Sequence, residues 1–525
     1  MFKKSLIIVF VLLSCYAISL IGCGEISPYP PDIAEALKEA GNNRAELERV
    51  LTHYSTSADT LKLQAAYFLI GNMEGHCYAT YVLKDTSGVE IDLNALDYPD
   101  FDALLKAADS IEAIRGEIDF EKDTLIYDLH VIDSQFLINQ IDYAFKAWRS
   151  KPWAANLSFD NFCRYVLPYR GSNEPLEPWR EIFWKKYRDI DTSLSDPANP
   201  IEVAARVNDD IKSWFGFDPR YYYHPTDQGL AEMMKTGLGR CEDMTNLTIY
   251  AMRAIGLAVT SDYTPFWANS GNNHAWNAIL TADSKVIPFM GAESNPGDYR
   301  LANKLAKVYR KTYDKQKDNL IFQKRKQEKV PGWLAGKSYI DVTPNYTDVC
   351  DVAVSFDKDI PDSVDIAYIC VFNSGQWQAI HWGRIKDGKA TFTGMGTDIA
   401  YLPALYLNEE ITPYGKPFIL GDDCQIRENK ADSIKTMSVE LTSTTARRQA
   451  VSTDGIAKSY LESGKQYELF YWADGWQSVG KSMAESDKPL LFDNVPMEAL
   501  YWLVVDNSNK EERIFTIEDG RQVWW

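Results

Sequence analysis

The stretch that most constrains the fold is residues 239–277, which predict a helix followed by a strand. It opens with Gly-Arg-Cys, and Cys241 leads into a segment whose apolar residues recur at helical spacing until Gly256. Cys241 is therefore expected in the first turn of a helix, where free backbone N–H groups and the positive end of the dipole favour a thiolate. His274 follows 33 residues later, at the head of the strand-like segment "HAWNAIL". A cysteine and a histidine on neighbouring elements are the pair that nucleophilic thiol chemistry needs.

These motifs resemble those of a known family. "GRC" at the start of a helix, "RAIG" near its end and "HAW" at the start of a strand resemble the transglutaminase-like superfamily of papain-type cysteine enzymes. The resemblance implies an α+β core with nucleophile, base and orienting acid in the order Cys, His, Asp. Cys241 and His274 match the first two positions. It also implies hydrolysis of an amide or peptide bond rather than cross-linking.

The orienting acid has no clean match in the sequence. If Asp283-Ser284 forms a two-residue hairpin turn, the resulting register puts Glu293 opposite His274, whereas the family's aspartate position falls on Gly291. We predict Glu293 as the substitute, because its side chain is longer and the segment "MGAESNPGD" is flexible enough to bend inward. Without an acid, His274 loses its orienting partner but can still act as a base.

The oxyanion of an acyl-transfer reaction needs hydrogen-bond donors. Papain-type enzymes supply one from a side chain upstream of the cysteine and the other from the backbone N–H at the cysteine. Gln228 and Trp214 are the candidates for the side-chain donor. His224, in the same segment, is interpreted as a loop histidine rather than a second base. No cofactor and no metal ion are predicted.

The N-terminus has the pattern of an exported protein. Residues 1–22 read as a signal peptide, with Lys3 and Lys4 before an apolar run. "LIGC" resembles a bacterial lipobox, which implies that Cys23 is lipidated and that residues 23–30 tether the protein to a membrane. The expected location is the cell envelope, in the periplasm or at the cell surface. An ordinary signal peptide or membrane anchor is the alternative.

Charge and cysteine content exclude several classes of partner and site. The net charge is −19 and no basic stripe is present, so nucleic acid is not an expected partner. Besides Cys23, Cys241 and the cysteine within the signal peptide, five cysteines remain. Their odd number and irregular spacing predict lone structural thiols rather than a metal site or a disulfide framework.

At 525 residues the chain is long enough for several domains. Helical periodicity predicts an α-helical domain over 31–155, followed by the transglutaminase-like core over 156–300 and a basic, helix-like linker over 301–337. From Asp341 onward the apolar period changes to two, which predicts strands. The predicted fold class is therefore α+β and multidomain.

An internal repeat divides the C-terminal part. "AYICVFNSGQWQAI" recurs as "YELFYWADGWQSVG". Three aromatic residues follow at nearly the same spacing in both copies: Trp377, Phe392 and Tyr401 in the first, and Trp476, Phe492 and Tyr501 in the second. This predicts two tandem all-β sandwich-like modules, 338–430 and 431–525. Their aromatic residues are expected to pack in cores and interfaces rather than to form a sugar-stacking platform.

Two functional hypotheses follow from the sequence. The first is a cell-envelope thiol hydrolase acting on a peptide, glycopeptide or peptidoglycan-like substrate through an acyl-thioester, with Cys241 as nucleophile, His274 as base and Glu293 as orienting acid. The second is an inactive surface protein that binds glycan or protein through its β modules, supported by the missing acid at Gly291. A purely structural role in a surface assembly is a third reading. The sequence leaves the oligomeric state open.

Overall fold

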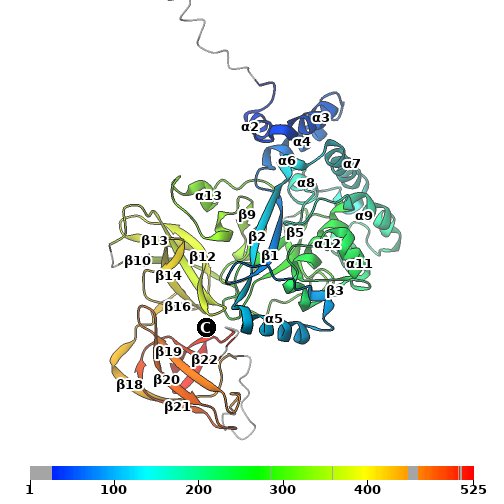
Figure 1. Cartoon of the computed structure of the whole chain (residues 1–525). Helices are drawn as coiled ribbons and strands as arrows, with labels where there is room; N and C mark the ends of the chain where they lie inside the picture. The colour runs from blue at the N-terminus through cyan, green and yellow to red at the C-terminus, as the bar shows by residue number, and fades with distance from the viewer. Residues whose placement is uncertain (1–26, 284, 357–358, 447–458, 507, 509–510) are drawn as a thin grey trace, which may run out of the picture.

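The computed structural model describes residues 27–525 except 284, 357–358, 447–458, 507 and 509–510. The predicted signal peptide and the lipidation site Cys23 therefore lie outside the described residues. Figure 1 shows helices at the N-terminal end, a mixed core around α12 (Cys241–Ala254), and two all-β modules toward the C-terminus. This confirms the predicted α+β class. In the described part of the chain, no helix combines the length and apolar character that a membrane span needs.

The N-terminal region packs three amphipathic helices around a more uniformly apolar one, α4 (Thr60–Asn72), and carries a long hairpin. The amphipathic helices are α2 (Pro31–Glu39), α3 (Arg44–Ser55) and α7 (Ser134–Ser150). Helical periodicity does not predict the antiparallel hairpin of β1 (Cys77–Asp85) and β2 (Ile118–Tyr127), whose connection contains α5 (Phe101–Arg115). The β1 sequence "CYATYVLKD" is rich in the aromatic and β-branched residues that favour strands.

The core places one helix against an antiparallel sheet. Its strands lie in the order β7 (Val286–Phe289), β6 (His274–Leu280), β5 (Val259–Thr264), β8 (Tyr309–Lys311) and β9 (Tyr339–Asp341). Nearly every side chain of α12 is buried. Against it pack α9 (Trp179–Tyr187), α10 (Pro200–Lys212) and α11 (Leu230–Thr236), with the short parallel pair β3 (Gly216–Phe217) and β4 (Leu238–Gly239). The chain also forms α6 (Asp128–Val131), which packs against β2, and α8 (Phe159–Tyr165).

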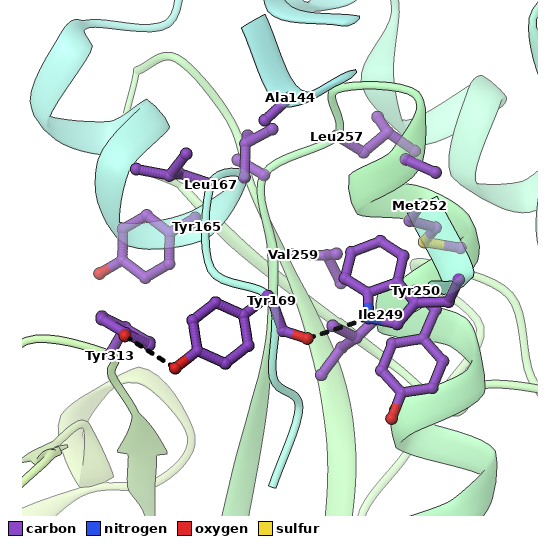
Figure 2. Packing of buried hydrophobic residues seen from close by; sticks show 14 of the residues in the cluster. Ala144, Tyr165, Leu167, Tyr169, Ile249, Tyr250, Met252, Leu257, Val259 and Tyr313 are labelled. Carbon is purple, nitrogen blue, oxygen red and sulfur yellow. Dashed lines mark hydrogen bonds between the residues drawn. The ribbon is translucent and has the colours of Figure 1, made fainter. Parts of the chain in front are cut away.

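The interior beside α12 is apolar and aromatic. In Figure 2, Ile249, Tyr250 and Met252 of α12 lie beside Leu257 and Val259 in the same buried cluster. α12 is enclosed on nearly every side although it also carries polar residues, and this burial offsets the conformational entropy that ordering the helix costs. The first turn of α12, and with it Cys241, is thereby held in one place.

Residues 301–337 differ from the predicted helical linker. They contain the one-turn α-helix α13 (Leu320–Gln323), a 3-10 turn at Gly332–Ala335 and the strand β8. Although the spacing of apolar residues there is helix-like, Arg310 pairs with Asp262 across the sheet, both in backbone register and through a buried ion pair of 2.7 Å. These tertiary contacts outweigh the local helical pattern, so the core sheet extends to residue 341.

The two C-terminal modules repeat one topology, as the internal repeat predicts. In the first module, β12 (Gln376–Arg384), β11 (Ile366–Asn373), β14 (Ile399–Leu407), β16 (Phe418–Leu420) and β17 (Ile426–Glu428) form a sheet in that order, with β15 (Glu410–Pro413) paired to β14. A second sheet pairs β10 (Val349–Ser355) with β13 (Lys389–Gly396).

The second module repeats this order with β20 (Trp476–Met483), β19 (Gln466–Trp472), β22 (Tyr501–Val505), β23 (Ile514–Glu518) and β24 (Arg521–Trp524), and pairs β18 (Asp432–Leu441) with β21 (Leu490–Met497). Equivalent hydroxyls make equivalent bonds. Tyr401 donates to the carbonyl of Gly396 and Tyr501 to that of Pro496, each five residues upstream.

The repeat tryptophans pack between the two modules. Trp377 meets Trp472 edge to face, with ring centroids 5.7 Å apart, and Phe372 meets Trp476 at 5.6 Å. The first residue of each pair belongs to the first module and the other to the second. This arrangement agrees with the expectation of interface packing.

One cysteine pair departs from the predicted lone thiols. Cys350 on β10 and Cys424, between β16 and β17, form a disulfide across 74 residues of sequence. The prediction of isolated thiols was wrong for this pair, because the fold of the module brings β10 beside the turn between β16 and β17, and their spacing in sequence does not indicate this contact. Cys77, Cys163 and Cys370 are free thiols.

Candidate active site

Cys241 is the first residue of α12, in the helical position that the sequence predicts. The preceding residue, Arg240, donates its backbone N–H to Asp243 Oδ2 at 2.9 Å, which caps the helix. Asp243 also accepts from the Gln228 backbone at 2.9 Å, so the incoming loop is tied to the first turn. The Cys241 side chain is only 5% exposed.

The surroundings of the sulfur favour the thiol. Cys241 Sγ donates to Glu242 Oε2 at 3.0 Å. Burial, followed by the Glu242 charge, raises the pKa of Cys241 well above its usual value, although a backbone hydrogen bond from Ala275 acts to lower it. The expectation of a favoured thiolate is wrong for this arrangement. A helix end contributes about 0.3–2 kcal/mol, which burial beside a carboxylate outweighs.

His274 begins β6 and pairs with Thr264 of β5. Its Nε2 lies 2.7 Å from the Tyr299 hydroxyl, and its ring stacks on Trp267 with centroids 5.7 Å apart. Burial lowers the pKa of His274, against an opposing effect of the Glu242 charge. The imidazole is therefore neutral at pH 7, the state in which it can accept a proton.

Cys241 and His274 lie on adjoining elements without a direct bond. Among the hydrogen bonds of the described residues, none joins the two side chains. Two features nevertheless place them together. The sulfur is hydrogen-bonded by the backbone of Ala275, the residue after His274, and the Glu242 charge acts on both side chains.

Glu293 does not orient His274 in the structure. Thr281 donates to the carbonyl of Lys285 at 3.0 Å, so the hairpin connection is one residue longer than the predicted turn. The observed register pairs Asn277 with Phe289, which corresponds to Ala292 rather than Glu293 opposite His274. β7 also ends at Phe289, and the Glu293 side chain is exposed. The Tyr299 hydroxyl is hydrogen-bonded to the imidazole Nε2 instead, a contact that the sequence did not predict.

Gly291 has no room for an acid. A Cβ at this position would lie 2.1 Å from Thr248 Oγ1 and 2.7 Å from Asn277 Oδ1. The Gly291 backbone instead donates to Asn277 Oδ1 at 3.2 Å. Close packing against α12 therefore requires glycine here, and an aspartate would clash.

The two oxyanion candidates serve structural contacts. Gln228 is completely buried and donates from Nε2 to the Leu238 carbonyl at 3.0 Å. Trp214 donates from Nε1 to Asp210 Oδ2 at 3.4 Å. Neither side chain is hydrogen-bonded to Cys241 or His274. In the described part of the chain, no group of three or more His, Cys, Asp or Glu side chains is arranged to hold a metal ion.

A comparison with protein families agrees with this geometry. Residues 188–289 match the model of the transglutaminase-like superfamily core. This segment is a transglutaminase-like domain. It contains Cys241 and His274, and it ends before Glu293 and Tyr299. A search of curated proteins found no significant match.

The β modules hold the loop that leads to the histidine of the transglutaminase-like domain. Asn373, at the end of β11, is buried, and its Nδ2 lies 2.9–3.0 Å from the carbonyl oxygens of Trp267, Ser270 and Asn272. Arg513 of the second module donates to the Ala268 carbonyl at 2.5 Å. The modules therefore fix the backbone just before His274, although they lie about 100 or more residues away in sequence.

The contacts that sequence reasoning missed come from Glu242, Tyr299 and Asn373. The contact of Glu242 could have been predicted, because Glu242 directly follows the nucleophile on the first turn of the helix. Tyr299 lies in an irregular segment, where side-chain direction depends on the tertiary path of the chain, and Asn373 ends a strand of another module, far from His274 in sequence.

Tyr299→Phe is expected to release the His274 ring with little effect on global stability. The substitution removes the hydroxyl at Nε2, a net loss of about 0.5–1.5 kcal/mol. With ¹⁵N-histidine labelling, His274 is expected to show one tautomer in the wild type and an averaged pair in the variant. Tyr222→Phe, which alters a hydroxyl on the Cys241 side, is the matched control. Identical His274 spectra in all three proteins would contradict the positioning role.

Proposed function

We propose that this protein is a cell-envelope thiol hydrolase that cleaves an amide or peptide bond. The observation that carries the proposal is the position of Cys241, at the start of α12 and hydrogen-bonded by the backbone next to His274. A neutral imidazole held at Nε2 by Tyr299 is suited to take the thiol proton through its other nitrogen. The match to a transglutaminase-like core supports the same chemistry.

The reaction proceeds through an acyl-thioester. Cys241 Sγ attacks the substrate carbonyl carbon while His274 takes the thiol proton, and the backbone N–H of Cys241 stabilises the oxyanion. His274 then gives this proton to the leaving amine as the C–N bond breaks. Water, deprotonated by His274, attacks the thioester, which releases the carboxylic acid and restores the thiol. Peptides, glycopeptides and peptidoglycan-like amides are the substrate classes of this proposal.

The proposed location is a bacterial membrane surface, with Cys23 as the lipid anchor. The lipobox-like "LIGC" supports this assignment. The Cys350–Cys424 disulfide supports it independently, because structural disulfides are typical of oxidising compartments outside the cytoplasm.

A second candidate is a catalytically silent transglutaminase-like protein. The observation in its favour is that Cys241 donates to Glu242 rather than to His274, with a thiol pKa well above the ordinary value. In the hydrolase, the incoming substrate has to displace this Cys241–Glu242 bond. In the silent protein the bond is permanent.

The test compares the wild type with Cys241→Ala and His274→Ala on a panel of synthetic peptides, glycopeptides and muropeptides, followed by mass spectrometry. The hydrolase is expected to yield cleaved products and a transient acyl adduct on Cys241. Cys241→Ala should abolish both, and His274→Ala should slow cleavage by about 10²–10⁴-fold. Cleavage that persists in Cys241→Ala would refute the mechanism. No cleavage in the wild type, with alkylation of Cys241 unaffected by His274→Ala, would favour the silent protein.

A further inference from the structure

A large cavity lies between the β1–β2 hairpin and the core sheet. Its volume is about 1100 Å³, slightly above the usual range of small-molecule sites. One wall comes from the hairpin and the other from β5, β8 and β9, while neither Cys241 nor His274 lines it. Figure 1 shows the hairpin running alongside β5 and β9. The cavity is thus separate from the candidate catalytic residues.

The walls carry an excess of positive charge in a chain whose net charge is −19. Five cationic side chains and two carboxylates line the cavity: Lys122, Arg170, Arg253, Lys311 and Lys337 against Glu39 and Glu74. Arg170 is paired with Asp128, and Lys337 with Glu74. Among the ion pairs of the described residues, none joins Lys122 or Lys311 directly to a carboxylate, although the Lys311 charge also acts on Asp227. Two ammonium groups are therefore available to an anionic ligand.

The two lysines stand on opposite walls, each next to a tyrosine. Lys122 of β2 is the direct cross-strand partner of Tyr81 of β1, so both side chains share a face of the hairpin. Lys311 Nζ lies 5.7 Å from the ring centroid of Tyr263 and donates to Ser172 Oγ at 2.5 Å. The Tyr263 hydroxyl makes no hydrogen bond within the described residues, so it remains free for a ligand.

The lysines and aromatic rings that line the cavity together indicate the class of ligand. Aromatic rings and the hydroxyl and amide side chains Ser172 and Asn173 outnumber aliphatic groups on the walls. Such surfaces suit a ring that is apolar on its faces and hydroxylated at its edge, and free ammonium groups suit a carboxylate. We propose that the cavity binds an acidic saccharide whose carboxylates pair with Lys122 and Lys311. The proposal is independent of hydrolysis at Cys241.

The test is calorimetric titration of the full chain with trigalacturonate, with neutral maltotriose as the uncharged saccharide and hexaglutamate as an acidic peptide. Trigalacturonate is expected to bind more tightly than either. Lys122→Met and Lys311→Met should each weaken its binding by about tenfold or more. Lys285→Met, which removes an exposed lysine outside the cavity, is the matched control.

Other outcomes overturn the proposal. Absence of trigalacturonate binding refutes it, as does equal binding of maltotriose that the lysine substitutions leave unchanged. Tighter binding of hexaglutamate with the same lysine dependence reassigns the cavity to an acidic peptide. The salt dependence of wild-type binding provides a test that needs no variant, because pairing with two ammonium groups must weaken as ionic strength rises. Binding that does not change with salt contradicts the assignment.

Discussion

Glu242→Gln is expected to accelerate alkylation of Cys241 at pH 7 by at least about tenfold. Glu242 Oε2 accepts a hydrogen bond from Cys241 Sγ at 3.0 Å, and the Glu242 charge is the second cause, after burial, of the raised pKa of Cys241. A carboxylate in contact shifts a neighbouring pKa by about 1–3 units, and each unit changes the thiolate fraction tenfold. Glutamine keeps the size of the side chain and removes the charge.

The measurement is the rate of iodoacetamide labelling of Cys241 against pH, read by mass spectrometry. Since only the thiolate reacts, the wild type should label slowly at pH 7 and faster as the pH rises above the range of an ordinary thiol. The curve of Glu242→Gln should lie at lower pH. Glu293→Gln, which removes an exposed carboxylate farther along the chain, should match the wild type. Equal curves for all three proteins would show that Glu242 does not control the thiol.

Arg170→Met is expected to lower the free energy of unfolding by about 3–5 kcal/mol. The Arg170 guanidinium makes a two-pronged ion pair with Asp128 and also donates to the Glu174 carbonyl. Asp128 and Glu174 are both buried, so the substitution leaves an uncompensated carboxylate inside the protein. Removal of one partner of a buried pair costs far more than loss of a surface pair.

Urea unfolding followed by far-ultraviolet circular dichroism checks this prediction, with Arg149→Met as the matched control. Arg149 pairs with Asp59 at the surface, where its side chain is 46% exposed, and its loss should cost about 1 kcal/mol or less. Similar destabilisation by the two substitutions would mean that burial of the Arg170–Asp128 pair does not determine its contribution.

Local pattern was sufficient to locate the two central residues of the site. The helix beginning at Cys241 and the strand beginning at His274 both follow from side-chain period and from the residues at their ends. The local pattern did not predict the hydrogen-bond partners of these two side chains. An extra residue in the β6–β7 connection moves the register by one, and a one-residue shift changes which side chain faces the imidazole.

In the larger architecture, too, some elements could be predicted from the sequence and others depended on tertiary contacts. The tandem β modules were predictable, because a repeat of "VFNSGQW" as "YWADGWQ" places matching aromatics on matching strands. The strand at Tyr309–Lys311 was not, because its helix-like spacing is overridden by sheet pairing and by the buried Arg310–Asp262 ion pair. The Cys350–Cys424 disulfide likewise depends on how β10 packs beside the turn between β16 and β17.

The sequence by itself determined the α+β class, the repeated β modules, and the placement of Cys241 and His274 at the heads of a helix and a strand. The class and the placement of the two residues rest on short-range periodicity, which acts within about a dozen residues, and the modules rest on a direct repeat of the sequence. Only the tertiary structure decided that Glu242 accepts a hydrogen bond from the thiol, that Tyr299 rather than Glu293 contacts the imidazole, and that Asn373 holds the loop before His274. The protonation of Cys241 belongs to this second group, because burial outweighs the local effect of a helix end.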